Sequence, residues 1–321
     1  MHIEIPTFAT IIWLLPFLVG TVNAQQKDLR TLRLSVFRAD AAMVAAKARG
    51  LFAAEGLEVK ITMTPNSTEQ MRGISKGSFE IASTAFDNVL AWSGKEGAEI
   101  IAVAQTVDKI VLPVFVRPEI REWNDLRGKK LAADAVDTAY ALVLRRILLA
   151  YGLDLDRGDY ELGAVGATDH RLESMTRGET FAAVLNPPID AKAEAAGMVR
   201  FGDHLSVLPD YPGGVLAVNR AWAQSHRDDL VRFLRAWLTA MRWVNDPANR
   251  EAAIKMVAAD LGFNPKTAAE RVSELSANGS LNVTGLEGVL ELRTQFGFKL
   301  PMGVVLTPYY DLDYYRAAAG K

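Results

Sequence analysis

The sequence contains no cysteine among its 321 residues. This absence excludes disulfide bonds, thiolate metal ligands, cysteine nucleophiles and the lipid-bearing cysteine that tethers exported lipoproteins. An excess of positive charge is also missing, because 36 Lys and Arg residues stand against 38 Asp and Glu residues, for a net charge of -2. No basic stripe is available to neutralise phosphates, so we do not expect nucleic acid as a partner.

Long apolar runs are missing except near the N-terminus. The run Ile11–Val22 contains Pro16 and spans about twelve residues, fewer than the ~20 that a membrane-spanning helix needs. It leads into Val22-Asn23-Ala24, the small-x-small pattern of a processing site, although residues 1–10 lack Lys and Arg. The sequence predicts an export signal at residues 1–24, cleaved near Ala24, and a mature protein in the periplasm. A retained membrane anchor is the alternative.

Catalytic and metal-binding motifs are missing as well. The four histidines are His2, His170, His204 and His226, and their spacing is not that of metal ligands. No phosphate-binding Walker loop, nucleophile elbow or zinc-protease helix occurs in the sequence. We therefore expect no enzymatic activity, no catalytic residue, no cofactor and no metal.

What the sequence does contain is a regular alternation of strand-like and helix-like segments from Leu32 to about Val218, which predicts the α/β fold class. In the first unit, the strand Leu32–Phe37 is followed by a helix that Asp40 can cap and that Gly50 can end. The next predicted elements are a strand Leu57–Ile61, a helix with capping-box spacing at Ser67 and Gln70, a strand Phe79–Ser83, and a helix that begins at Thr84 or Asp87.

A second series of strands and helices follows a β-branched run at Ile110–Val116. Its predicted elements are a strand Leu131–Ala133, a helix Thr138–Tyr151 closed by Gly152, and a strand Ala182–Leu185. The chain is then expected to return at Gly213–Val218 to a helical tail, in which Leu230, Leu234, Trp237 and Met241 form one apolar stripe. With 50% hydrophobic residues, two lobes are expected: residues 25–112 and 214–321 in the first, and 113–213 in the second.

Four segments carry a family resemblance: Ala46–Val59, with Gly50-Leu51-Phe52 and Glu55-Gly56-Leu57, then Gly77–Ala82, Trp123–Lys130 and Tyr310–Tyr315. In this order they resemble the periplasmic binding proteins of the SsuA/THI5-like branch, which serves nitrate, sulfonate, taurine and thiamine-pyrimidine importers. The resemblance implies a type II periplasmic binding protein fold, in which two α/β lobes are joined by two crossing strands.

The resemblance also implies a function: the periplasmic solute-binding component of an ABC transporter, which captures a small organic molecule in the cleft between the lobes and delivers it to the permease in the inner membrane. We expect a monomer. Two alternatives remain, a receptor that feeds a membrane sensor kinase and a pyrimidine-synthesis enzyme of the same fold. The enzymes of that kind rely on a cysteine-rich motif, which this sequence lacks.

Candidate ligand-binding residues follow from the fold, because ligands of open α/β sheets bind outside the carboxyl ends of the strands. Arg38 is the candidate anchor for an anionic group, since its planar guanidinium can grip a carboxylate or sulfonate. Capping is an equally good explanation for Ser67 and Asp87, and the better one for Asp40. The full set of candidates is Phe37, Arg38, Asp40, Asn66, Ser67, Thr84, Asp87, Asp137, Thr138, Asn186 and Tyr211.

The loop Asp134–Thr138 departs from the pattern of the resembling family, in which a serine-type anion cradle is expected. Its two carboxylates, Asp134 and Asp137, would repel a strongly anionic ligand unless an arginine or a cation lay between them. The sequence therefore favours a cationic, neutral or mixed ligand over a nitrate-like or sulfonate-like one.

Overall fold

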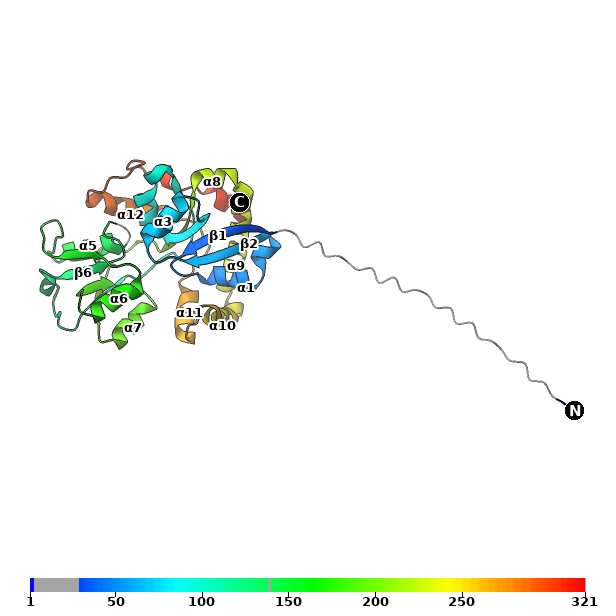
Figure 1. Cartoon of the computed structure of the whole chain (residues 1–321), viewed down its shortest axis with the longest axis horizontal. Coiled ribbons are helices and arrows are strands. Elements are labelled where there is room, and N and C mark those ends of the chain that lie inside the picture. Colours follow the sequence, from blue (N-terminus) through cyan, green and yellow to red (C-terminus); the bar gives the residue numbers. More distant parts are fainter. Residues whose placement is uncertain (3–28, 138–139, 321) are drawn as a thin grey trace.

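The computed structural model describes residues 1–2, 29–137 and 140–320 (Figure 1). All but the first two residues of the expected export signal, and the candidate Thr138, lie outside this part of the chain. Within the described ranges, none of the helices is both long enough and apolar enough to cross a membrane.

Two five-stranded sheets organise the chain, and they lie side by side in two bodies (Figure 1). We name them, with the helices that pack on them, the first lobe and the second lobe. The first sheet has the strand order β2 (Leu57–Met63), β1 (Arg30–Val36), β3 (Ile81–Ala85), β10 (Gly214–Asn219), β4 (Ile100–Gln105). The second has the order β7 (Glu161–Ala164), β6 (Lys130–Ala133), β8 (Ala182–Val184), β5 (Pro113–Val116), β9 (Val199–Asp203).

In each sheet one strand runs opposite to the other four. β1 runs parallel to β2 and β3, and β6 runs parallel to β7 and β8. β10 is antiparallel to both β3 and β4, and β5 is antiparallel to β8 and β9. The expected α/β class is confirmed. The segment expected to return between lobes is itself a strand inside the first sheet, and the lobe boundaries stay a prediction.

Thirteen α-helices are present in the described residues. They are α1 (Ala41–Ala48), α2 (Leu51–Ala54), α3 (Ser67–Ser75), α4 (Phe86–Trp92), α5 (Tyr140–Ala150), α6 (Thr168–Thr176), α7 (Ile189–Ala195), α8 (Arg220–Ser225), α9 (Arg227–Asn245), α10 (Arg250–Leu261), α11 (Pro265–Ser273), α12 (Val283–Gln295) and α13 (Asp313–Ala319). Short 3-10 helices lie at Lys95–Gly97, Trp123–Leu126, Pro247–Asn249 and Thr307–Tyr309.

Three predictions of helix starts can be compared with the structure. Asp40 caps α1 as expected, because its Oδ1 accepts a hydrogen bond from the Met43 N–H at 2.7 Å. The cap of α3 is Asn66, which accepts from the Glu69 N–H at 2.8 Å, so the prediction of a capping box on Ser67 is wrong by one residue. α4 begins after Ala85 with no side-chain cap, so neither Thr84 nor Asp87 caps it.

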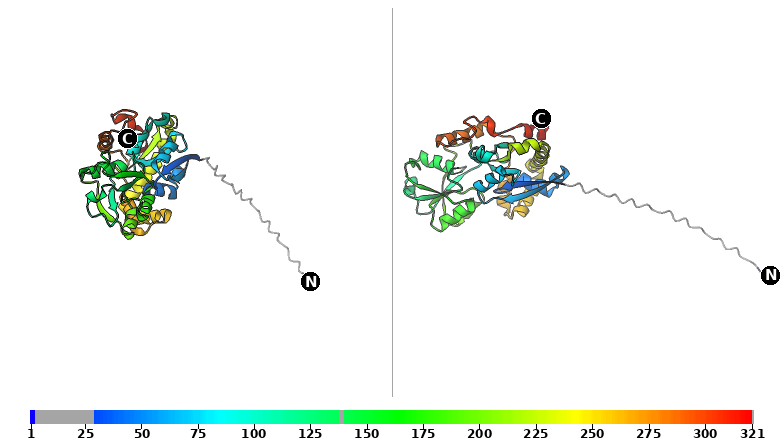
Figure 2. Two further views of the ribbon diagram at one scale, coloured as in Figure 1. Left: turned by 60° about the vertical axis from the view of Figure 1, so that its left-hand side comes forward. Right: turned by 45° about the horizontal axis from the view of Figure 1, so that its top comes forward.

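The first lobe has its own apolar core, and the C-terminal helices complete it. Leu230, Leu234, Trp237 and Met241 of α9 are all buried in one cluster with residues of β1 and α1, and α9 packs on α1, which confirms the predicted stripe. A second apolar cluster extends across both lobes, since it includes α4 and β4 of the first lobe, β5 and α5 of the second, and α12. α12 packs against both α4 and α5, and Figure 2 shows its orange ribbon next to the green second lobe.

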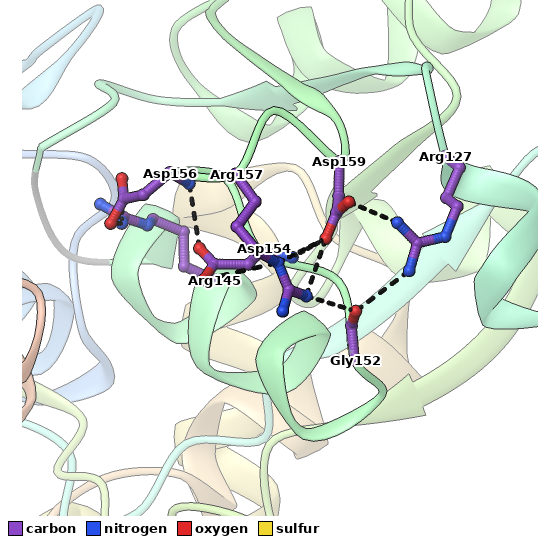
Figure 3. A network of polar contacts seen from close by, with 7 residues as sticks. All are labelled: Arg127, Arg145, Gly152, Asp154, Asp156, Arg157 and Asp159. Atoms are coloured by element: carbon purple, nitrogen blue, oxygen red, sulfur yellow. Dashed lines mark hydrogen bonds and ion pairs between the residues drawn. The ribbon is translucent and has the colours of Figure 1, made fainter.

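A surface network of polar contacts holds the segment between α5 and β7 (Figure 3). Asp159 forms ion pairs with Arg127 and with Arg157, the second at 2.9 Å, and both arginines also donate to the Gly152 carbonyl. The Asp154 N–H also donates to the Asp159 carboxylate, at 2.8 Å. This hydrogen bond is the largest cause that lowers the pKa of the Asp159 carboxyl, and the two arginines lower it further. The network fixes a turn of the second lobe and lies outside the cavity described next.

Candidate functional site

A cavity of about 480 Å³ lies between the two lobes. Its walls come from the segments that follow β1, β2 and β3 in the first lobe and β6, β7 and β8 in the second. These are the carboxyl ends of the parallel strands in both sheets, where open α/β folds bind ligands. The volume lies in the range of small-molecule sites.

Arg38 lies in this wall, next to Phe37, directly after β1. Its guanidinium carbon lies 5.3 Å from the centre of the Phe263 ring, a distance typical of a cation–π contact. Burial lowers the pKa of Arg38, and the nearby charge of Arg271 lowers it further. In the described residues no carboxylate forms an ion pair with Arg38, so its charge is available to a ligand.

Asp40 lines the same wall while it caps α1. The indole Nε1–H of Trp237 donates to its two carboxylate oxygens at 3.3 and 3.2 Å. Burial raises the pKa of Asp40 to about 6, and the hydrogen bonds from Met43 and Trp237 oppose this shift without cancelling it. The carboxyl is therefore both a structural cap and a cleft residue.

The end of β3 contributes Thr84 and the first turn of α4 contributes Asn88. The Asn88 side-chain amide donates to the Thr84 hydroxyl at 2.8 Å, which fixes the position of that hydroxyl at the cavity wall. Both residues are buried. A hydroxyl held in this way can bond a polar group of a ligand without first losing rotational freedom.

The second lobe supplies a chain of three polar side chains. The Thr168 hydroxyl donates to the side-chain Oδ1 of Asn186 at 2.9 Å and accepts from Nη2 of Arg171 at 2.7 Å. Arg171 is only 2% exposed, and burial lowers its pKa, whereas the negative charge of Asp134 opposes this shift. Of these three side chains the sequence predicts only Asn186 as a ligand contact, because its pattern does not reveal the short strand β7 that precedes Thr168 and Arg171.

The remaining candidates among the described residues lie outside the cavity wall, and their assignment as ligand contacts, like that of Thr138, stays a prediction. Ser67 donates to Oδ2 of Asp134 across the lobes at 2.5 Å, and Asp134 itself lines the cavity. Asp87 and Asp137 are bound by Arg293, which lies 3.0 Å from the Asp87 carboxylate and 2.8 Å from the Asp137 carbonyl. Tyr211 is buried with its ring edge toward His204. Asn66 caps α3.

The charge balance of the cavity differs from the one that the acidic loop suggested. Asp134 lines the wall, as do Asp40 and Asp169, but Asp137 does not. Three arginines line it as well: Arg38, Arg171 and Arg271. Arg271 comes from α11 in the C-terminal tail, pairs with Glu274 at 3.0 Å, and donates to the Pro187 carbonyl of the second lobe at 3.4 Å. The three arginines thus balance the three carboxylates of the wall, and of these arginines the sequence predicts only Arg38 at the cleft.

The histidines show no arrangement for metal binding. Nδ1 of His204 accepts from the Leu112 N–H at 3.3 Å in the protein interior, and His226 stacks on Trp222 at 5.5 Å between ring centres. His170 lines the cavity. Across the described part of the chain, no group of three or more His, Asp or Glu side chains could hold a metal ion.

Comparison with solved structures identifies the fold as that of the periplasmic binding proteins. A Bordetella bronchiseptica protein is 20% identical, with a TM-score of 0.75 over 91% of this chain and 98% of that one. The alkanesulfonate-binding protein SsuA of Xanthomonas axonopodis pv. citri, bound to MOPS, is 16% identical, with a TM-score of 0.71 over 89% and 99%. The nitrate-binding protein NrtA of Synechocystis is 13% identical, with a TM-score of 0.73 over 91% and 89%.

The sequence itself matches the NMT1/THI5-like family over residues 39–250. The chain belongs to this family, which confirms the resemblance seen in the sequence. A search of curated proteins found no match.

Proposed function

We propose that this protein is the periplasmic solute-binding component of an ABC importer, which holds a small organic molecule between its lobes and delivers it to a membrane permease. The observation that carries the proposal is the cavity at the carboxyl ends of both sheets, with polar side chains from both lobes in its wall. The folds of SsuA and NrtA, a sulfonate-binding and a nitrate-binding protein, support it.

The mechanism is a population shift between an open and a closed arrangement of the lobes. A ligand that touches Arg38 in the first lobe and Asn186 in the second binds the closed arrangement better, and stabilises it by that difference in affinity. Direct contacts between the lobes, such as the Ser67–Asp134 hydrogen bond, add to the closed state. The permease then distinguishes the loaded protein by its shape.

The proposal includes no chemical step. Its support is the lack of cysteine in the sequence and a cavity wall in which the titratable groups are mainly arginines and carboxylates with binding or capping contacts. We further propose that the mature protein is a periplasmic monomer, released from the export signal at residues 1–24, with one lobe formed by residues 113–213.

The first experiment combines binding with transport. Native mass spectrometry of the protein from its own cells should show a retained small molecule, and a thermal-shift panel of sulfonates, carboxylates, amines and pyrimidines should give a ligand-dependent rise in melting temperature. Deleting the gene should abolish uptake of that compound. Unchanged uptake would replace the importer by a sensory receptor, and conversion of the compound would replace it by an enzyme.

Both lobes should contribute to the affinity for the compound identified in that panel. Arg38→Gln and Asn186→Ala should each weaken binding by about tenfold, since each removes one hydrogen-bonding group from the wall. Calorimetry would measure this, with Arg235→Gln and Asn124→Ala as controls, because these side chains lie outside the cavity in the first and second lobe. Equal affinities for the cavity variants and their controls would reject the proposed placement.

Closure can be followed directly, because the sequence offers no competing thiol. Spin labels on Lys60→Cys and Glu194→Cys would report the distance between the lobes, since both positions are exposed and one lies in each lobe. The ligand should shorten this distance and narrow its distribution. An unchanged distribution at saturating ligand would contradict closure.

A further inference from the structure

One buried arginine of α12 contacts both lobes at once. Nη1 of Arg293 lies 3.0 Å from the carboxylate of Asp87, which belongs to α4 of the first lobe. The same nitrogen donates to the carbonyl oxygen of Asp137, in the loop that follows β6 of the second lobe, at 2.8 Å. We name these two contacts the Arg293 bridge. Because the pair with Asp87 joins two charged groups, it is stronger than a bond between neutral groups.

Both partners of the Arg293 bridge stand next to residues of the cavity wall. Asp87 precedes Asn88, which lines the cavity, and Asp137 belongs to the same loop as Asp134, which lines it as well. Helix α12 is described throughout, and none of its residues lines the cavity. Arg293 therefore contacts a neighbour of the wall in each lobe, while it lies outside the wall itself.

The end of α12 is also bound to the second lobe by arginine–aromatic contacts. The guanidinium carbon of Arg145 in α5 lies 4.2 Å from the centre of the Phe296 ring, directly after α12. Arg145 is buried and pairs with Asp156 of the second lobe at 3.0 Å. Together with the apolar packing of α12 on α4 and α5 (Figure 2), these contacts make α12 a buried joint between the lobes.

The Arg293 bridge lies beside the segment in which the chain returns from the second lobe to the first. That segment, between β9 and β10, contains the buried Tyr211. Burial raises the pKa of the Tyr211 hydroxyl well above its ordinary value, the charge of Asp87 raises it further, and the charge of Arg293 opposes this shift. Both charges are therefore close to the returning segment. A contact beside a crossing is displaced least when two lobes rotate, so it can persist while the cleft opens.

We propose that Arg293 is a positioning residue for the cavity wall: its bridge holds α4 of the first lobe and the loop after β6 of the second lobe together, and the two lobes turn about α12. The hydrogen bond from Ser67 to Asp134 at the cleft then breaks on opening, whereas the bridge stays intact. This inference deepens the proposed function and rests on it in one respect, the movement of the lobes, but its tests require no bound compound.

The first test measures the distance between the lobes without any added compound. With spin labels on Lys60→Cys and Glu194→Cys, the distance distribution should become at least about twofold wider in Arg293→Met, because the wall segments are no longer tied together. The double variant Asp87→Asn/Arg293→Met removes the bridge without leaving a buried charge, so it covers the case in which Arg293→Met fails to fold. It should widen the distribution to the same extent.

Arg220→Met is the matched control for these two bridge variants. Arg220 also pairs with a carboxylate, that of Glu99 at 2.8 Å, and also donates to a backbone carbonyl, that of Pro308, but both partners belong to the first lobe. The cleft labels should therefore keep the wild-type distribution in Arg220→Met, even if it loses as much stability. An unchanged distribution in the bridge variants, or equal widening in Arg220→Met, would overturn the proposal.

A second pair of labels follows the joint itself. Glu287 of α12 and Ala150 of α5 are exposed, so Glu287→Cys and Ala150→Cys place one label on each side of the contact. Their distance distribution should be the same with and without Ser67→Ala, which removes a contact of the cleft. If this pair widens as much as the cleft pair does, the lobes do not turn about α12.

Failure of this inference can be distinguished from failure of the proposed function. If a compound of the panel binds and its uptake depends on the gene, but the bridge variants match Arg220→Met, the importer function stands and the role of Arg293 is wrong. If no compound binds and uptake is unaffected, the proposed function itself fails, and the label distances still decide the role of the bridge.

Discussion

The two lobes touch in two places of opposite character. At the cleft, polar contacts between described residues of the two lobes include the hydrogen bond from Ser67 to Asp134 and the one from Arg271 to the Pro187 carbonyl. At α12 the contact is apolar and buried, because Leu286 and Val289 join Leu142 of α5 in one cluster. When polar contacts break, their groups can form hydrogen bonds with water instead. When apolar surfaces separate, no such bonds form, and their exposure to water costs free energy. The lobes can therefore part at the cleft at a far lower cost than at α12.

The two contacts also differ in the partners that they give to a buried carboxylate. At the α12 contact, Asp87 is fully buried and paired with Arg293, which is itself only 3% exposed. At the cleft, Asp40 is buried with N–H donors but without an ion pair in the described residues, and its pKa is raised to about 6. One carboxylate thus has a buried arginine as its counter-ion, whereas the other has no ion pair among the described residues and a raised pKa.

Breaking the α12 contact should have the largest effect on stability. Arg293→Met leaves the Asp87 carboxylate buried without its cation and removes the bond to the Asp137 carbonyl, so we expect the free energy of unfolding to fall by about 3–5 kcal/mol. Urea unfolding at pH 7 would measure it. The double variant Asp87→Asn/Arg293→Met should recover part of this loss, because no buried charge remains. A loss below about 1 kcal/mol would show that the α12 pair is dispensable.

The raised pKa of Asp40 should make the free energy of unfolding depend on pH. Because the pKa of Asp40 is about 6 in the folded protein and about 3.9 in an unfolded chain, the folded state binds its proton more tightly. Its effect on the free energy of unfolding is then an unfavourable change of up to about 3 kcal/mol as the pH rises from 4 to 6. Asparagine keeps the acceptor that caps α1 and carries no charge, so Asp40→Asn should lack this change.

The measurement is the difference in unfolding free energy between Asp40→Asn and the wild-type protein at several pH values. This difference should grow in favour of the variant between pH 4 and 6 and stay constant above about pH 7. A difference independent of pH would mean that Asp40 keeps an ordinary pKa.

The smallest effect on stability is expected from the polar contact across the cleft. Ser67→Ala removes the hydrogen bond to Asp134, and since that carboxylate regains water when the lobes part, the free energy of unfolding should change by less than about 1 kcal/mol. The distance between labels on Lys60→Cys and Glu194→Cys, without ligand, should become longer or broader. A loss of stability as large as that of Arg293→Met would remove the distinction between the two contacts.

The α/β class, the first strand and helix, and the apolar stripe of α9 could be predicted because each depends on a local pattern. β7 could not, since Glu161–Ala164 contains Gly163 and has no β-branched residue. Because β7 was not predicted, the first turn of α6 and Arg171 were not predicted as cleft residues either. Arg271 was hidden for another reason: it belongs to a helix of the tail, and only the tertiary fold brings it to the cleft.

The place of β10 has a consequence for how the chain acquires its structure during synthesis. Val215 and Leu216 pair with Thr84 and Ser83 on one side and with strand β4 on the other, so the first sheet has a gap until about 215 residues have been made. The second sheet uses only residues 113–203 and is complete before that point. The second lobe, although it begins later in the chain, can therefore fold first. The N-terminal strands of the first lobe can complete their sheet only when β10, more than 100 residues further along the chain, has been made, and pairing over such a long stretch of chain slows folding.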